Sequence, residues 1–272
     1  MNLLLLGDVV GRPGREAVKH RLPGLRRDLA IDVAIVNAEN AAHGFGLTEK
    51  ICGELYEAGA DVLTTGNHVW DQREIIPYLE RDTRVLRPAN FPPGTVGSGV
   101  YRHTLADGRH ALVINLMGRL FMDALDDPFR ALDGAIEGLA LGRDVAAVVV
   151  DFHGEATSEK TAFGHFCDGR VSAVIGTHTH IPTADHQILP GGTGYISDLG
   201  MCGNYDSVIG MEKEASLRRF LTKMPGPKKP QVAEGEATLC GVLVATDDRT
   251  GLCRRIEPVR LGGRLAPYVP AL

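Results

Sequence analysis

The sequence predicts an α/β fold in which buried strands alternate with helices. The observations behind this prediction are short apolar runs that end in Gly, Asp, Asn or His, and helical patterns that lie between several of them. Short runs that are apolar at almost every position are typical of strands buried on both faces. Their alternation with helical segments is typical of a layered α/β architecture.

The expected strands lie within six apolar segments. These are 3–8 (LLLLGD), 33–40 (VAIVNAEN), 62–68 (VLTTGNH), 111–118 (ALVINLMG), 146–154 (AAVVVDFHG) and 173–180 (AVIGTHTH). Helical patterns are expected over three further segments. These are 48–59, which has Thr48 as its N-cap and a glycine as its stop signal, 126–142 and 157–169.

Two segments interrupt the alternation. Residues 99–116 predict a β-hairpin around Asp107-Gly108, and residues 237–261 predict two strands joined by a turn at 247–251. Antiparallel pairs added to an α/β core indicate a mixed or two-sheet sandwich. The Pro-, Gly- and Lys-rich segment 223–236 predicts an exposed loop. Because we find no internal repeat and no convincing boundary, we expect one domain over residues 1–272.

Composition limits the classes of function. The chain has 272 residues and a formal net charge of -5, so bulk binding to nucleic acid is not expected. Its five cysteines are odd in number, widely spaced and without a CxxC pair, which argues against a disulfide framework and a thiolate zinc site. The N-terminal four leucines are too few for a signal peptide, and no run approaches the length that spans a bilayer. We therefore expect a cytoplasmic protein with no membrane partner.

Polar side chains gather near the ends of the expected strands, where open α/β sheets bind their ligands. The set is Asp8, Glu39, Asn40, Asn67, His68, His153, His178 and His180. Each residue type also has a plainer interpretation: an aspartate can cap a helix, an asparagine can hold a turn, and a lone histidine is more often structural than a ligand. These interpretations must hold independently, whereas one metal site explains the whole set, so we favour the metal site.

The donor types indicate which metals are suitable. Carboxylate, amide and imidazole ligands without a thiolate suit Mn²⁺, Fe²⁺ or Zn²⁺. Eight such groups are too many for one tetrahedral ion, but they fit two metals about 3.5–4 Å apart, as in enzymes that hydrolyse phosphate esters. Glu39 is the candidate bridge between them. Residues two apart in an extended segment point to the same side, so His178 and His180 are expected to reach one metal each.

Five motifs in this order resemble the calcineurin-like metallophosphoesterase superfamily. They are GDVVG (7–11), NAEN (37–40), GNHVWD (66–71), DFHGE (151–155) and GTHTH (176–180). The usual histidine two residues after the first aspartate is absent, and the second motif centres on Glu39 followed by Asn40. These departures, together with the segments 39–48, 151–160 and 197–210, resemble the YmdB-type branch, in which an asparagine takes the place of the missing ligand.

The resemblance implies a four-layer sandwich of two mixed β-sheets flanked by helices. It implies that one metal is bound by Asp8, Asn40 and His180, that the other is bound by Asn67, His153 and His178, and that Glu39 bridges them. His68 would be a catalytic acid rather than a ligand. Fe and Mn are the most suitable metals, with Zn as a further candidate. His43 stands where the branch leads us to expect an asparagine.

The function predicted from these residues is hydrolysis of a phosphodiester. A hydroxide bridging two divalent metals would attack phosphorus, and His68 would protonate the leaving alkoxide. The resemblance implies cyclic nucleotides as small-molecule substrates, 2',3'-cyclic forms before 3',5'-cAMP. The candidates for the substrate rim are His43, Gly44, Tyr195, Ser197 and Tyr205. Two acidic residues are candidates for orienting a histidine, namely Asp71 and Glu155.

Alternatives stay open at this point. The same metals would serve a phosphomonoesterase or protein phosphatase, and only the pocket rim would differ. A non-hydrolytic nucleotide or metal sensor is a third hypothesis, against which His68 weighs because a binding site needs no general acid. The apolar surplus in residues 112–123 is compatible with a lid or a protein interface, including one between identical subunits.

Overall fold

The N-terminal leucines form β1 (Asn2–Leu6), an inner strand of the first β-sheet in the computed structural model, which describes residues 1–224 and 230–271. In spatial order this sheet contains β14 (Cys253–Leu261), β13 (Leu239–Thr246), β1, β3 (Val33–Asn37), β4 (Val62–Thr64) and β5 (Val85–Leu86). Strands β1, β3, β4 and β5 are parallel, whereas β13 is antiparallel to both β1 and β14. The C-terminal segment therefore forms the pair of strands predicted for residues 237–261.

The second sheet is also mixed. In spatial order it contains β10 (Gln187–Ile188), β11 (Gly194–Ile196), β9 (Ala173–Thr177), β8 (Ala147–His153), β7 (His110–Met117) and β6 (Val100–Thr104). Strands β7, β8, β9 and β11 are parallel, and β6 pairs with β7 as the predicted hairpin. Gly108 has a φ of 87° in its turn, a conformation that glycine adopts without strain. A two-stranded sheet joins β2 (Asp8–Val9) to β12 (Met201–Cys202).

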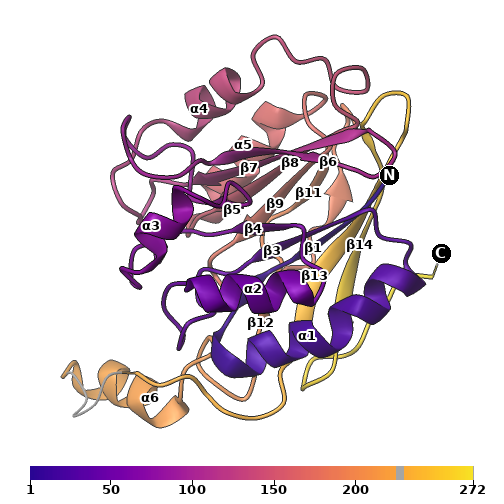
Figure 1. Cartoon of the computed structure of the whole chain (residues 1–272). Coiled ribbons are helices and arrows are strands. Elements are labelled where there is room, and N and C mark those ends of the chain that lie inside the picture. The colour runs from indigo at the N-terminus through magenta and orange to yellow at the C-terminus, as the bar shows by residue number, and fades with distance from the viewer. Residues whose placement is uncertain (225–229, 272) are drawn as a thin grey trace.

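Helices cover the outer face of each sheet (Figure 1). The first sheet carries α1 (Gly11–Asp28) and α2 (Glu49–Glu57), the second carries α4 (Pro128–Ala135) and α5 (Thr157–Cys167), α3 (Ile75–Leu79) lies near β5, and α6 (Lys213–Thr222) projects at the edge of the molecule. The Thr48 hydroxyl accepts a hydrogen bond from the amide of Ile51, so the N-cap predicted for α2 is confirmed.

Alternate residues of the strands enter different hydrophobic layers. Leu3 and Leu5 of β1 pack between the two sheets, whereas Leu4 packs against α1 and α2. In β7, Val113 faces the other sheet and Leu112 packs with side chains of α4 and α5. The result is three apolar layers between four layers of secondary structure, which confirms the predicted sandwich.

Some predicted helices differ from those observed. The pattern over 126–142 predicted a helix of that length, but α4 ends at Ala135, because Gly138 and Gly142 adopt left-handed φ values of 73° and 84°. Helix α1 was not predicted at all, since Gly11, Pro13 and Pro23 interrupt its helical pattern. Helices α3 and α6 were also missed.

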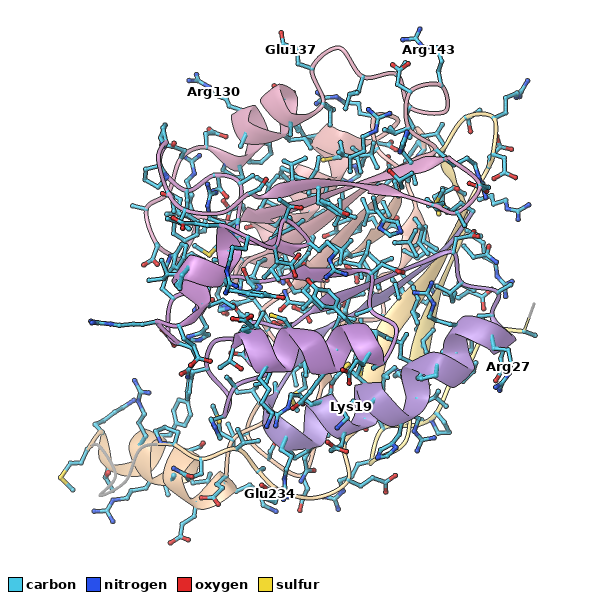
Figure 2. The ribbon with its side chains drawn as sticks, viewed as in Figure 1. Lys19, Arg27, Arg130, Glu137, Arg143 and Glu234 are labelled. Carbon is cyan, nitrogen blue, oxygen red and sulfur yellow. The ribbon has the colours of Figure 1, made fainter. Side chains whose placement is uncertain are left out.

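The surface shows how the remaining segments are arranged. Charged side chains such as Lys19 and Arg130 point outward from the helices (Figure 2).

Of the expected loop 223–236, residues 225–229 lie outside the described residues. Lys223 is exposed, but Ala233 is buried, which corrects the prediction there. No helix among the described residues is both long and apolar enough to cross a membrane.

Most of the apolar residues in 112–123 belong to the core. Strand β7 buries them either between the two sheets or between its own sheet and the helices that cover it. Only Leu120 and Phe121, beyond the end of β7, are large apolar side chains exposed in this segment, with Phe121 at 88%. The prediction of a lid or interface therefore stays open for these two side chains alone.

Candidate metal centre

The polar residues predicted to form a site all meet where parallel strands of both sheets end. Asp8 follows β1, Glu39 follows β3, His68 follows β4, and His178 follows β9. Asn40, Asn67 and His180 lie at three of the same strand ends, and His153 is the last residue of β8. The carboxyl ends of parallel strands lie at one edge of a sheet, and here the edges of two packed sheets coincide. The structure thus brings all eight residues together.

The cluster contains two groups of candidate metal donors, and they share one carboxylate. Glu39, His153 and His178 form one group, and Asp8, Glu39 and His180 form the other; within each group the donor atoms lie within 4.8 Å of one another. The amide of Asn67 joins the first group, with Oδ1 at 3.0 Å from Nε2 of His153. The amide of Asn40 joins the second, with Nδ2 at 3.2 Å from Nε2 of His180.

The surroundings of His153 suit a cation better than a hydrogen bond. Its Nε2 lies 3.0 Å from Nδ1 of His178, 3.0 Å from Oδ1 of Asn67 and 3.2 Å from Oε1 of Glu39. A single N–H cannot satisfy three acceptors. Asp8 adds to this, because its Oδ1 is buried without a hydrogen-bond partner in the structure, a costly arrangement for a carboxylate unless a cation is nearby. The donor set therefore fits metal ions.

Each imidazole has a partner on the side that faces away from the donor cluster. That partner indicates which ring nitrogen carries the proton and which faces the cluster without one. Nδ1 of His180 lies 2.8 Å from the carbonyl oxygen of Ile209, which can only accept, so that nitrogen carries the proton and Nε2 faces the cluster without one. Nε2 of His178 faces a carboxylate oxygen of Glu155 at 3.3 Å, and its Nδ1 faces the cluster, 3.0 Å from Nε2 of His153. Partners of this kind orient histidine ligands in metal sites.

The same logic applies to His153. Its Nδ1 lies 2.9 Å from Oγ1 of Thr177, and that hydroxyl donates to Oδ1 of Asp151 at 2.7 Å. The hydroxyl therefore accepts from Nδ1 of His153, and Nε2 is left for the cluster. Asp151 and Thr177 were not singled out in the sequence; their signal was a carboxylate inside an apolar strand.

The charges in the cluster shift one another's protonation. Burial disfavours ionisation of Glu39, but attraction by His153 outweighs it and lowers the pKa of Glu39 to about 2. Burial likewise opposes a charge on His153, yet the attraction of Glu39 raises its pKa to about 9. Burial raises the pKa of Asp8 to about 6, and burial together with repulsion by His153 lowers the pKa of His178 to about 3. The carboxylate of Glu39 thus attracts positive charge to the centre of the cluster.

The loop after β9 is not extended, contrary to the prediction. His178 and His180 have φ values of 99° and 68°, in a region that residues other than glycine rarely adopt. Both imidazoles still face the cluster, because the carboxylate of Asp198 accepts hydrogen bonds from the backbone N–H and the hydroxyl of Thr179 at 3.0 and 2.7 Å. Backbone strain of this kind is commonly found at functional sites.

His68 lies beside the donors but belongs to neither group. Its Nδ1 lies 2.8 Å from Oδ2 of Asp71, and its backbone N–H donates to Oε2 of Glu39 at 3.2 Å. The ring of Phe45 packs edge-on against it at 5.1 Å between centroids. The structure therefore pairs Asp71 with His68 and Glu155 with His178, as the sequence suggested for these two acidic residues.

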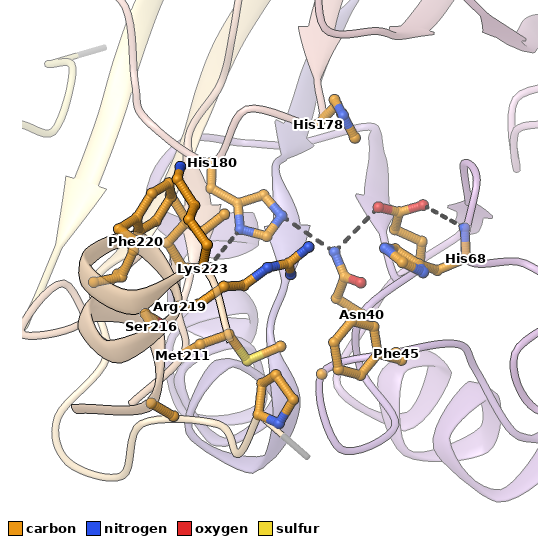
Figure 3. Close-up of a pocket in the computed structure, with 16 residues that line it drawn as sticks. Asn40, Phe45, His68, His178, His180, Met211, Ser216, Arg219, Phe220 and Lys223 are labelled. Atoms are coloured by element: carbon orange, nitrogen blue, oxygen red, sulfur yellow. Dashed lines mark hydrogen bonds between the residues drawn. The ribbon is translucent and has the colours of Figure 1, made fainter. Parts of the chain in front are cut away.

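A cavity of about 720 Å³ opens over the cluster. Its floor includes Glu39, Asn40, His68, His178 and His180, and its opposite wall comes from the segment 208–220 (Figure 3). The wall residues are Val208, Ile209, Met211, Ala215, Ser216, Arg219 and Phe220. Lys223 and Pro230 also line the cavity. The part of this wall after residue 210 was missed because nothing in its sequence distinguishes it from an ordinary surface segment.

Of the five rim residues predicted from the sequence, only Gly44 lines the cavity. His43 is exposed in a left-handed turn with a φ of 56°, a conformation that asparagine and histidine tolerate better than most residues. The other three are structural: Tyr195 and Ser197 are buried at the second sheet, and the hydroxyl of Tyr205 donates to the carbonyl oxygen of His180 at 3.0 Å. Tyr205 therefore holds the backbone of His180 and does not line the cavity itself.

Two mixed sheets, flanking helices and a shared edge of carboxylate and imidazole donors define a protein of the metallophosphoesterase class. The model of the YmdB-like protein family matches residues 4–259, and the chain belongs to this family.

The chain is 48% identical over 259 residues to the 2',3'-cyclic-nucleotide 2'-phosphodiesterase of Bacillus subtilis, covering 95% of this chain and 96% of that protein. Among solved structures, it is similar to a hypothetical protein from Thermus thermophilus, with 44% identity, a TM-score of 0.89 and coverage of 97% and 100% of the two chains. It is also similar to a novel phosphatase from Mycoplasma pneumoniae, with 36% identity, a TM-score of 0.87 and coverage of 96% and 93%. These matches confirm the predicted branch and fold.

Proposed function

We propose that this protein is a metal-dependent phosphodiesterase with two metal ions, which hydrolyses cyclic nucleotides and prefers 2',3'-cyclic forms to 3',5'-cAMP. The observation that carries the proposal is the pair of buried donor groups that share Glu39, placed under a cavity that His68 also lines. The name of the Bacillus subtilis relative supports the substrate class. Strain in a five-membered cyclic phosphate favours its opening and supports the preference.

One ion would be held by Asp8, Asn40 and His180, and the other by Asn67, His153 and His178. Glu39 belongs to both sets. For Asn40 to serve, its side-chain oxygen rather than its nitrogen would face the ion, an exchange that only rotates the amide. The mixture of oxygen and imidazole donors fits Fe or Mn, and also Zn. When bound, these ions act as Lewis acids and make a hydroxide nucleophile available at neutral pH.

The chain's own side chains supply the rest of the chemistry. His68 protonates the leaving oxygen from Nε2, since its Nδ1 is held by Asp71. The apolar side chains of Phe45, Met211 and Phe220 line the same cavity and exclude water from one side of the bound ester. They also offer a surface against which a nucleobase can pack.

A cytoplasmic location is part of the proposal. All five cysteines are buried free thiols, namely Cys52, Cys167, Cys202, Cys240 and Cys253. Free thiols in this number are ordinary in a reducing compartment.

The proposal is tested with metal-stripped protein titrated with Mn²⁺. The substrates are 2',3'-cAMP, 3',5'-cAMP, an aryl phosphodiester and an aryl phosphomonoester. We expect metal-dependent cleavage of the diesters, fastest for 2',3'-cAMP. Preference for the monoester would instead indicate a phosphatase, the activity in the name of the Mycoplasma pneumoniae structure. Absence of turnover from protein that binds two metals would contradict an enzymatic role.

A further inference from the structure

The wall of the cavity opposite the donor cluster carries a cation without a partner. Helix α6 presents Ala215, Ser216, Arg219 and Phe220 to the cavity, a spacing of four residues that places them on one helical face. In Figure 3 the guanidinium of Arg219 extends from the helix into the cavity and points toward Asn40. Arg219 therefore faces the site from the side opposite the two sheets.

No side chain among the described residues accepts a hydrogen bond or forms an ion pair with the Arg219 guanidinium. Lys213, at the start of α6, is by contrast paired, with its Nζ 3.0 Å from a carboxylate oxygen of Asp206. Helix α6 has no buried residue, so Arg219 has no packing role in the core. An unpaired cation that points into a cavity is available for an anionic ligand.

We propose that Arg219 binds an anionic phosphate oxygen of the substrate and thereby determines how tightly phosphate esters bind. This inference rests on the proposed function, because it takes the phosphodiester as the ligand of the cavity. A guanidinium presents paired N–H donors that match two phosphate oxygens, and such charge-assisted hydrogen bonds are stronger than neutral ones. The donor cluster approaches the phosphate from the sheets, and Arg219 approaches it from α6.

The test compares Arg219→Gln with Arg218→Gln. Arg218 is the neighbouring arginine on the same exposed helix and does not line the cavity, so its substitution removes the same charge from the same helix. Two quantities are measured on Mn²⁺-loaded protein: the KM for 2',3'-cAMP and for an aryl phosphodiester, and the Kd of inorganic phosphate by calorimetry. Arg219→Lys serves as the conservative variant.

We expect Arg219→Gln to raise the KM for both diesters and the Kd of phosphate by about tenfold or more, the effect of losing a charge-assisted hydrogen bond. Arg218→Gln should change these values less than about twofold, and Arg219→Lys should recover part of the loss. Equal effects of Arg218→Gln and Arg219→Gln would overturn the proposal. So would a loss confined to 2',3'-cAMP, since Arg219 would then contact the nucleoside.

The phosphate measurement separates this inference from the proposed function. If wild-type protein cleaves none of the diesters, the proposed function fails, but a tenfold difference in phosphate Kd between the two arginine variants still supports Arg219 as the phosphate-binding residue. If the diesters are cleaved and both variants bind phosphate equally, the assignment of Arg219 fails while the function stands.

Discussion

The ammonium of Lys160 lies 2.9 Å from Oδ2 of Asp198, and both side chains are almost fully buried. Lys160 also donates to the carbonyl oxygen of Thr177 at 2.8 Å, the last residue of β9. The same Asp198 oxygen holds Thr179, which lies between the two histidines with positive φ. This ion pair therefore fixes the loop that carries His178 and His180.

Replacing Lys160 tests this relationship. We expect Lys160→Met to destabilise the protein by about 3–5 kcal/mol, because it leaves Asp198 as a buried charge without a partner. The matched control is Lys213→Met, which breaks the exposed pair with Asp206 and should cost less than about 1 kcal/mol. Urea unfolding measures both. Equal costs would show that the buried pair does not anchor the loop.

Removing His68 separates catalysis from metal binding. His68→Ala should lower kcat about 10²- to 10⁴-fold, the usual contribution of a positioned general acid. Its metal content should match that of wild type, because His68 belongs to neither donor group. Turnover of 2',3'-cAMP and elemental analysis of the same sample provide the two readouts. A variant that retains full turnover would rule out the role given to His68.

Asp71 is expected to act only through His68. Asp71→Asn keeps the shape of the side chain but weakens the 2.8 Å contact with Nδ1, so kcat should fall, though by less than in His68→Ala. In the double variant, Asp71→Asn should add no further loss, since the group it positions is absent. Additive losses would show that Asp71 has a separate role.

Gly66 has no room for a side chain, because two candidate metal ligands pack closely against its backbone. A Cβ at this position would lie 2.3 Å from Nε2 of His153 and 2.4 Å from Oε2 of Glu39. We therefore expect Gly66→Ala to displace donors and to abolish binding of at least one metal. Gly53→Ala is the control: a Cβ there meets nothing within 4 Å, and alanine should stabilise α2 by up to about 1 kcal/mol. Metal content and unfolding free energy are measured for both.

The buried thiols give a prediction that depends on pH. Burial raises the pKa of Cys240 and of Cys253 to about 11, so both stay protonated in the folded protein at pH 8. A thiol-specific chromogenic reagent should react slowly with native protein and rapidly with all five cysteines in urea. Because the folded pKa values are raised, their contribution to stability is complete below about pH 9 and falls as the pH rises toward 11. Rapid reaction of native protein at pH 8 would contradict this burial.

The position of a site residue could be predicted from the sequence where that residue lies at the end of a strand. Asp8, Glu39 and His153 could be placed together because each terminates an apolar run, and parallel strands end at a common edge. The layers could be predicted because strands such as β1 are apolar on both faces. These inferences need only local patterns and the rules of sheet packing.

Structural features could not be predicted from the sequence where long-range contacts override the local conformational preference. The loop that carries His178 and His180 is held by Asp198, which follows β11, and by Lys160 of α5, so its contacts come from other elements of the fold. Arg219 could not be recognised either, because its local pattern is that of a solvated helix. Pro13 and Pro23 obscured α1, which forms because Val18, Leu22 and Leu25 pack against the first sheet.

Counting metals in wild type and three variants tests the central claim, a pair of donor groups that share Glu39, most directly. Elemental analysis of protein reconstituted with Mn²⁺ should give about two ions per chain. Asn40→Ala and Asn67→Ala should each retain one, because each removes a ligand from a different group, whereas Glu39→Ala should reduce binding at both. One ion per chain in wild type, or full occupancy in Glu39→Ala, would contradict the account.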